Sequence, residues 1–265
     1  MYAFEYHRPS SSKEALDLAA KKSEGKFLAG GQSLVQAMKL RLSSPSDLID
    51  LGSVSELKNL KVEGNTVLVG AMVRHAEVAA SPAVQKAIPA LAALAGMIGD
   101  RQVRHMGTIG GSLANSDPAA DYPAAVLGLG ATISTHKRKI EADKFFKGLY
   151  ETALEPGELI TQVSFPAPKR AAYMKFKNPA SRFALVGVFV ADFGGNVRVA
   201  VTGAGACAFR QPDMEKALAA KFAPESVANI KVKSDGLNND LHASPEYRAH
   251  LITVMAKRAV EAALK

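Results

Sequence analysis

Ala29-Gly30-Gly31-Gln32-Ser33 and Thr108-Ile109-Gly110-Gly111-Ser112 share one pattern, a pair of adjacent glycines followed by a hydroxyl residue. Glycine permits close approach of the backbone and positive φ. A hydroxyl residue can begin a helix, whose first N–H groups lack intrahelical partners and attract anions. One such segment can hold one phosphate group. Two of them, far apart in the chain, predict a site that grips a diphosphate from both sides.

The residues around the first double glycine predict a compact βαβ-like unit. A strand is expected at 26–29, a helix at 34–40 and a second strand at 47–51. The capping-box pattern Ser11-Ser12-Lys13-Glu14 predicts an earlier helix. We therefore assign residues 1–55 to a first subdomain.

The next part of the chain mixes strands and helices. Glu63-Gly64-Asn65 predicts a hairpin turn. The expected strands are 57–62, 66–69, 131–135, 139–142 and 159–165, and the expected helices are 82–94 and 123–129. The polar, glycine-rich stretch from Gly107 to Asp121 is interpreted as an irregular binding loop.

Alternating prolines at Phe165-Pro166-Ala167-Pro168 mark the clearest boundary, because proline resists both helix and central strand. Beyond it we expect strands at 173–177, 183–192 and 197–202, then helices at 213–221 and 245–264. The prediction is an α+β fold with units 1–55, 56–167 and 168–265.

Composition limits the function classes. The chain has 265 residues, 48% of them hydrophobic, and a net charge of +8 that favours anionic partners. Cys207 is the only cysteine, so this chain cannot hold an iron–sulfur cluster, and the six histidines form no metal-binding pair. No apolar run reaches the ~20 residues of a membrane helix. The N-terminus carries acid and histidine in place of an apolar leader, and we expect a cytoplasmic protein.

Two other functions compete at this point. Gly203-Ala204-Gly205-Ala206-Cys207-Ala208 fits a dinucleotide fingerprint after a strand, which would indicate a nicotinamide-dependent Rossmann oxidoreductase. Arg210, Gln211 and Pro212 interrupt the helix that this motif requires. A basic nucleic-acid-binding module is the other alternative. The densest basic cluster of the chain is His136-Lys137-Arg138-Lys139, and it is better interpreted as a solvated hairpin turn.

With these residues in view, the chain resembles the FAD-binding medium subunit of molybdenum hydroxylases, the carbon monoxide dehydrogenase and xanthine dehydrogenase family. The matching stretches are Phe4 to Pro9, Leu28 to Leu34 with Lys39 to Leu42, Gly107 to Asn115 with Asp117 to Asp121, and His242 to Arg248. The resemblance implies a two-subdomain FAD-binding fold of the vanillyl-alcohol oxidase type, followed by a C-terminal sheet-and-helix domain.

The resemblance also implies which residues hold FAD. The diphosphate-binding residues would be Phe27, Leu28, Ala29, Gly30, Gly31, Gln32, Ser33 and Leu34, with Thr108, Ile109, Gly110, Gly111 and Ser112. Asn115 belongs to the second stretch, and Asp121 would bond the polar middle of the cofactor. Ile160 and Lys175 match positions at its ring end. No side chain is expected to be a catalytic acid or base, and none to bind a metal.

By the same resemblance, the chain is an electron-transfer subunit of an oxidoreductase. A large partner subunit would carry the molybdenum cofactor and choose the substrate, and a small one would carry [2Fe-2S] clusters. The expected assembly is a dimer of heterotrimers, a heterohexamer, that passes electrons through FAD to an external acceptor. The resemblance implies neither a nucleic-acid partner nor a transmembrane segment.

Overall fold

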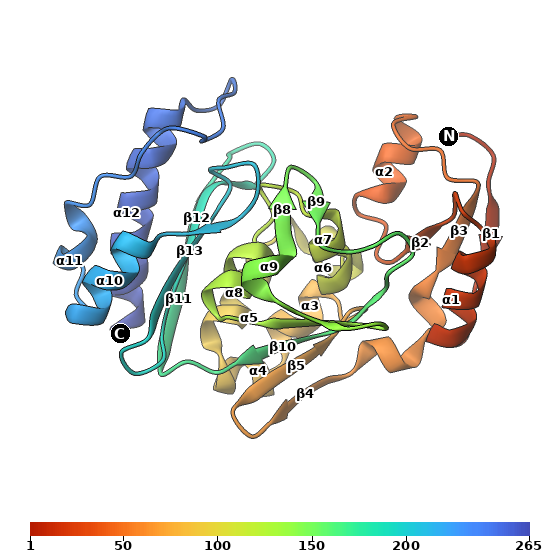
Figure 1. The fold of residues 1–265 in the computed structure, drawn as a ribbon, viewed down its shortest axis with the longest axis horizontal. Coiled ribbons are helices and arrows are strands. Elements are labelled where there is room, and N and C mark those ends of the chain that lie inside the picture. Colours follow the sequence, from red (N-terminus) through yellow and green to blue (C-terminus); the bar gives the residue numbers. More distant parts are fainter.

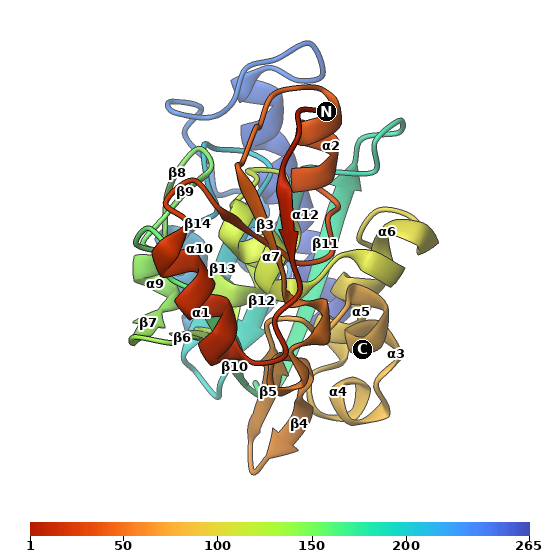
Figure 2. The same cartoon turned by 90° about the vertical axis from the view of Figure 1, so that its right-hand side faces the viewer.

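The computed structural model describes residues 1–265, and its N-terminal unit is a small parallel sheet. The strand order is β1 (Glu5–His7), β3 (Asp47–Asp50), β2 (Lys26–Leu28), with α1 (Ser12–Lys21) and α2 (Leu34–Lys39) as connections. Helix α1 begins where predicted, because the Ser11 side chain accepts a hydrogen bond from the Glu14 amide. The βαβ prediction is confirmed, with β1 as an additional strand. Figure 2 looks onto this unit.

The middle unit is a five-stranded antiparallel sheet with helices on one side (Figure 1). Its order is β4 (Leu60–Glu63), β5 (Thr66–Gly70), β10 (Ile160–Pro166), β6 (Thr132–Thr135), β7 (Lys139–Glu141). The predicted hairpin is confirmed, although its first strand begins only at Leu60, after a short 3-10 turn. The helices are α3 (His75–Ala80), α4 (Pro82–Ala87), α5 (Pro89–Gly96), α6 (Arg101–Met106), α7 (Ile109–Asn115), α8 (Tyr122–Gly128) and α9 (Ala142–Phe145), and a two-stranded hairpin joins β8 (Phe146–Gly148) to β9 (Glu151–Thr152).

Two predictions for this unit are wrong. The single helix expected at 82–94 is two helices, because Pro89 has no N–H to donate and Ile88 before it takes an extended φ of −141°. The stretch expected to be irregular, Gly107 to Asp121, contains α7, and α6 ends just before it. Thr108 begins α7 by accepting a hydrogen bond from the Gly111 amide, so the second double glycine forms the first turn of a helix.

The C-terminal unit is a four-stranded antiparallel sheet between two helical layers. The strands are β11 (Arg170–Lys177), β12 (Ala184–Asp192), β13 (Val197–Thr202) and β14 (Phe209–Arg210). The helices α10 (Pro212–Ala220), α11 (Glu225–Ala228) and α12 (Pro245–Ala263) cover one face, and α5 and α8 cover the other (Figure 1). Because both faces are covered, every residue of β12 is buried, which explains its uninterrupted apolar sequence.

The apolar cores show how the units are joined. The largest cluster combines side chains of the middle unit with Tyr173, Phe189 and Ala200 of the C-terminal sheet, so it continues across the proline-rich boundary. The N-terminal sheet packs on a separate cluster of only seven buried side chains, including Ile49 and Leu51. None of the helices has both the length and the apolar character needed to cross a bilayer.

Candidate functional site

The two double-glycine segments lie against each other, although they come from different units. A Cβ atom on Gly30 would be 2.1 Å from the Met106 carbonyl oxygen and 2.7 Å from Cα of Gly107. A Cβ atom on Gly111 would be 3.5 Å from Cβ of Ala29. In Figure 1, α7 lies on the side of the middle unit that faces β2 and α2. The fold therefore brings together the segments that the sequence analysis paired.

The first segment presents a row of free backbone donors. The amides from Gly30 to Leu34 donate to no acceptor of the chain, in a region where most backbone N–H groups are paired. Gly31 has a φ of +72°, a conformation that glycine adopts readily and that occurs in turns whose successive N–H groups can bind an anion. Phe27 and Leu28 end β2 and lead into the turn, while Gln32 and Ser33 are exposed. This arrangement fits a phosphate group.

The second segment differs from the expectation, because four of its five amides are already paired. Ile109 donates to the Val73 carbonyl at 3.1 Å and Gly110 to the Ala71 carbonyl at 2.9 Å. Gly111 donates to Thr108 Oγ1 at 3.2 Å, and Ser112 to the Thr108 carbonyl. Ser112 lies inside α7 and does not begin a helix. The segment therefore contributes a small-residue surface facing the first. Its Thr108 amide donates to no acceptor of the chain, and its Gly111 amide makes only the long bond to the Thr108 hydroxyl.

His75 supports the second segment from below, and the sequence analysis missed it. Its backbone amide donates to the Gly107 carbonyl at 3.0 Å, and a Cβ on Gly107 would be 2.5 Å from His75 Nε2. Burial and, to a smaller extent, the Arg104 cation lower the pKa of His75 to about 4, so the ring is neutral at pH 7. No motif in the sequence singled it out, because none of the six histidines pairs with another.

Asp121 and Lys175 form a buried ion pair across 54 residues of sequence. Lys175 Nζ lies 2.9 Å from Asp121 Oδ2 and also donates to the Met97 carbonyl at 3.2 Å. The other carboxylate oxygen accepts the Tyr173 hydroxyl at 2.5 Å. Burial raises the pKa of Asp121, against the opposing effects of Lys175 and Tyr173, and raises the pKa of Tyr173. Both predicted site residues thus lie at one place, with Tyr173 as an unpredicted third member.

The remaining predicted residues lie on the same side of the middle unit. Asn115 is the half-buried last residue of α7. Ile160 is the buried first residue of β10, which packs against α7. The next residue, Thr161, accepts the Ala71 amide through its carbonyl, and Ala71 in turn accepts the Gly110 amide. Backbone bonds therefore connect the start of β10 to the second double glycine.

The structure rejects the dinucleotide fingerprint. Gly203 follows β13, but that strand runs antiparallel to both neighbours, and the next element is the strand β14. A Cβ on Gly203 would meet the Ala184 carbonyl at 2.5 Å, so this glycine is required for packing. Cys207 beside it is half-buried, and burial raises the pKa of its thiol, which makes it a poor nucleophile.

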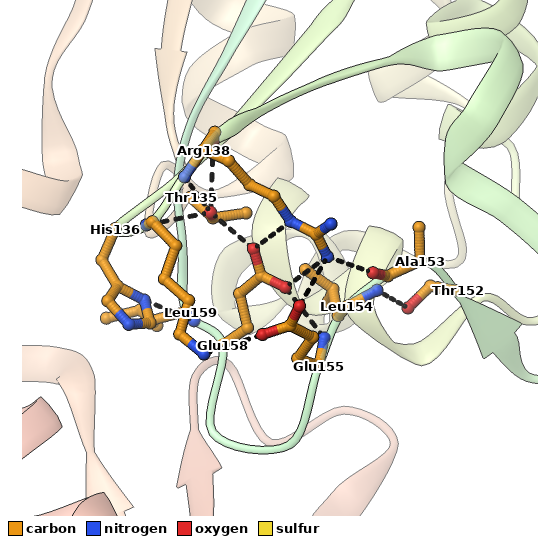
Figure 3. A network of polar contacts seen from close by, with 10 residues as sticks. Thr135, His136, Arg138, Thr152, Ala153, Leu154, Glu155, Glu158 and Leu159 are labelled. Atoms are coloured by element: carbon orange, nitrogen blue, oxygen red, sulfur yellow. Dashed lines mark hydrogen bonds and ion pairs between the residues drawn. The ribbon is translucent and has the colours of Figure 1, made fainter.

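The basic cluster at 136–139 forms the predicted hairpin turn between β6 and β7. Two of its three cations, Lys137 and Arg138, are paired with acids, as Figure 3 shows for Arg138. Arg138 binds Glu158 through Nε at 3.0 Å and Nη2 at 2.9 Å, and Lys137 binds Glu155 at 2.9 Å. These pairs leave only the exposed Lys139 without an acidic partner, and one cation does not form a basic patch for phosphates.

The chain is similar to known FAD-binding proteins over nearly its whole length. Residues 2–168 match the family model described as the FAD binding domain in molybdopterin dehydrogenase. The chain is 38% identical to the nicotine 6-hydroxylase medium subunit of Paenarthrobacter nicotinovorans, covering 97% of this chain and 96% of that one. It is 36% identical to the carbon monoxide dehydrogenase medium chain of Hydrogenophaga pseudoflava, over 98% and 96% of the two chains.

Solved structures support the same relationship over the full length. A chain of quinoline 2-oxidoreductase from Pseudomonas putida 86 superposes with a TM-score of 0.91 at 31% identity, covering 99% of this chain and 97% of that one. The match includes the C-terminal sheet and helices, which lie beyond the family model. The chain belongs to the family of FAD-binding medium subunits of molybdopterin-dependent dehydrogenases.

Proposed function

We propose that this chain holds the FAD diphosphate at the junction of its two double-glycine segments. The observation that carries the proposal is the row of unpartnered amides from Gly30 to Leu34 beside Gly111. Those N–H groups would bind the phosphate oxygens, and the side-chain-free surface of Gly111 would leave room for them. The helices that follow are short, so the amides and not a helix dipole supply most of the attraction.

The other site residues extend this site toward the ring end of the cofactor. Asn115 and Asp121 would bond hydroxyl groups in its middle, since carboxylate and amide oxygens accept such bonds well. Lys175 would face the ring, fixed in place by Asp121 and the Met97 carbonyl. Ile160 would provide apolar contact. None of these side chains needs to act as a general acid or base.

The bound cofactor would supply the redox chemistry, by accepting a pair of electrons and releasing them to a second molecule. In this proposal the chain works in a complex with a large molybdenum-cofactor subunit and a small [2Fe-2S] subunit, as a dimer of heterotrimers. Names such as medium chain and medium subunit among its relatives support such partners. We place the complex in the cytoplasm, in keeping with the single, unpaired cysteine. We also propose units 1–55, 56–167 and 168–265 as its domains, with FAD between the first two.

A titration of the FAD-free full chain with FAD tests the proposal. We expect saturable binding, read from the flavin absorbance and fluorescence. Gly111→Asp should weaken it by about 100-fold or more, roughly 2.7 kcal/mol, because the new carboxylate meets Ala29 and repels phosphate. The matched control is Gly64→Asp in the β4–β5 turn, where a Cβ meets no atom within 4 Å and where Asp is one of the few residues that adopt a φ near the observed +56°. Equal FAD affinity in both variants would refute the assignment.

A further inference from the structure

A cleft lined by cations opens beside the ring-end residues. It has a volume of about 350 Å³ and lies between the α5–α6 region and β11 with its following turn. Its lining residues are Gly96, Met97, Gly99, Arg104, Lys175, Lys177 and Arg182. Figure 2 shows α6 and the β11–β12 turn projecting on the same side of the molecule. We call this the basic cleft. Its volume is that of a small-molecule site.

Most of the charge in the basic cleft is not compensated. Lys175 is neutralised by Asp121, but the other three cations make no ion pair with any acid of the chain. Arg104 donates only to the carbonyls of Ile98 and Gly99, at 2.9 and 3.2 Å. Lys177 and Arg182 are exposed. Like charges gathered in a concave site repel one another, and a bound anion removes that repulsion.

The fold fixes the side chain of Arg104 and the backbone that carries Arg182. The two carbonyl bonds fix the guanidinium of Arg104. Arg182 has a φ of +64°, unusual for a residue with a side chain, in a turn organised by the buried Asn178. The Asn178 side chain accepts the amides of Ala180 and Ser181, and its carbonyl accepts the Arg182 amide at 2.9 Å. The fixed guanidinium of Arg104 is suited to forked bonds with phosphate or carboxylate.

We infer that the basic cleft binds a small ligand through ionised phosphate or carboxylate groups, and that this ligand is the external electron acceptor. The second half of the inference rests on the proposed function, because Lys175 connects the cleft to the residues assigned to the cofactor ring. A neutral acceptor would leave Arg104, Lys177 and Arg182 without counter-charges. The structure therefore favours an anionic acceptor over an uncharged one.

Calorimetric titration of the FAD-saturated full chain tests the anion site, since FAD then occupies the double-glycine segments. The probes are inorganic pyrophosphate for the phosphate class and citrate for the carboxylate class. We expect saturable binding of at least one probe that weakens with added KCl. The double variant Lys177→Gln/Arg182→Gln should bind it at least about tenfold more weakly, because each charge-assisted bond contributes substantially. The control Lys86→Gln/Lys216→Gln removes two exposed cations outside the cleft and should bind normally.

Reoxidation of the reduced, FAD-loaded chain tests the acceptor assignment. Each reduced flavin gives its electron pair to two ferricyanide anions, forming two ferrocyanide ions, and its protons enter the buffer. The double variant should slow this reaction about tenfold relative to the control, and should leave the rate with a ferrocenium cation unchanged or faster.

Three results would overturn the inference. Equal anion affinity of the double variant and the control would remove the site. Binding to the FAD-free chain that disappears on FAD saturation would show that the cofactor itself fills the cleft. Equal rates with ferricyanide in both variants would refute the acceptor assignment. If the chain takes up no FAD, the proposed function is refuted. The anion site can still be tested on the FAD-free chain, by comparing the anion affinity of the double variant with that of the control.

Discussion

The Met106 carbonyl oxygen lies 2.1 Å from the position that a Cβ atom on Gly30 would occupy. No side chain fits in that space, so the contact between the two double-glycine segments depends on glycine at position 30. The same position begins the row of free amides. Close packing of the two segments requires glycine at this position, and the proposed FAD site uses the backbone amide of the same residue.

Gly30→Ala should separate the segments. We expect the variant to lose FAD affinity and to lower the free energy of unfolding by about 1–3 kcal/mol, the usual cost of overpacking. FAD titration and urea unfolding measure the two effects. Gly96→Ala is the stability control, because its added Cβ would meet only Ala79 at 3.9 Å in a helix. Unchanged stability of Gly30→Ala would contradict the close approach of the two segments.

Asp121→Asn should be strongly destabilising, because it leaves the buried Lys175 ammonium without its counter-charge. The expected loss is about 3–5 kcal/mol. Lys175→Met in the same chain should restore much of that loss, since a buried pair can be replaced by apolar groups of similar size. Urea unfolding of the single and double variants gives the coupling energy. Additive effects would show that the two side chains do not interact.

The Glu158 network of Figure 3 predicts a pH-dependent stability. Bonds from Arg138, Thr135 and the Glu155 amide lower the pKa of Glu158 to about 2 despite its burial. Its stabilisation is fully present above the unfolded value near 4.5 and is lost as the pH falls toward 2. Glu158→Gln should cost about 1–3 kcal/mol at pH 7. The unfolding free energies of both proteins should converge below pH 4.5, and a constant gap would disprove the role of the charge.

Protonation of His75 should also lower the free energy of unfolding as the pH falls, as that of Glu158 does, but over a higher pH range. Its folded pKa of about 4 lies below the unfolded value of 6.5, so the unfolded chain binds the proton first as the pH falls. The loss between pH 6.5 and 4 is about 1–3 kcal/mol. His75→Phe should flatten the pH dependence in this range, whereas His250→Gln, at an exposed position, should preserve it. Unfolding curves at pH 7, 6 and 5 provide the comparison.

Local patterns predicted the elements that depend on local chemistry. We recognised the capping serine of α1, the Gly64 turn and the apolar run of β12. Each of these features is determined by residues that are adjacent in the sequence. The break at Ile88 was missed although Pro89 was visible, because the apolar periodicity on both sides is helical. Strand β1 has only three residues, too few to show any period.

The candidate site was only partly predictable for a physical reason. The paired glycines can be recognised in the sequence. Which of their amides remain free cannot, because it depends on acceptors from another part of the chain, such as the Ala71 and Val73 carbonyls. The bonds of Tyr173 and Lys175 to Asp121 join residues more than 50 positions apart. Arg182 carries no motif, and only the turn built on Asn178 places it beside Arg104.

The seven-residue apolar cluster beneath the N-terminal sheet has a consequence for how the protein is assembled in the cell. So small a cluster can hold the first 50 residues only loosely to the rest, and a cofactor bridging Gly31 and Gly111 would act as a clamp between them. Chains that fold before meeting their flavin should expose this region to proteases and exchange its amide protons early. The supply of cofactor would then determine how much of the polypeptide escapes proteolysis, as well as what fraction of it carries flavin.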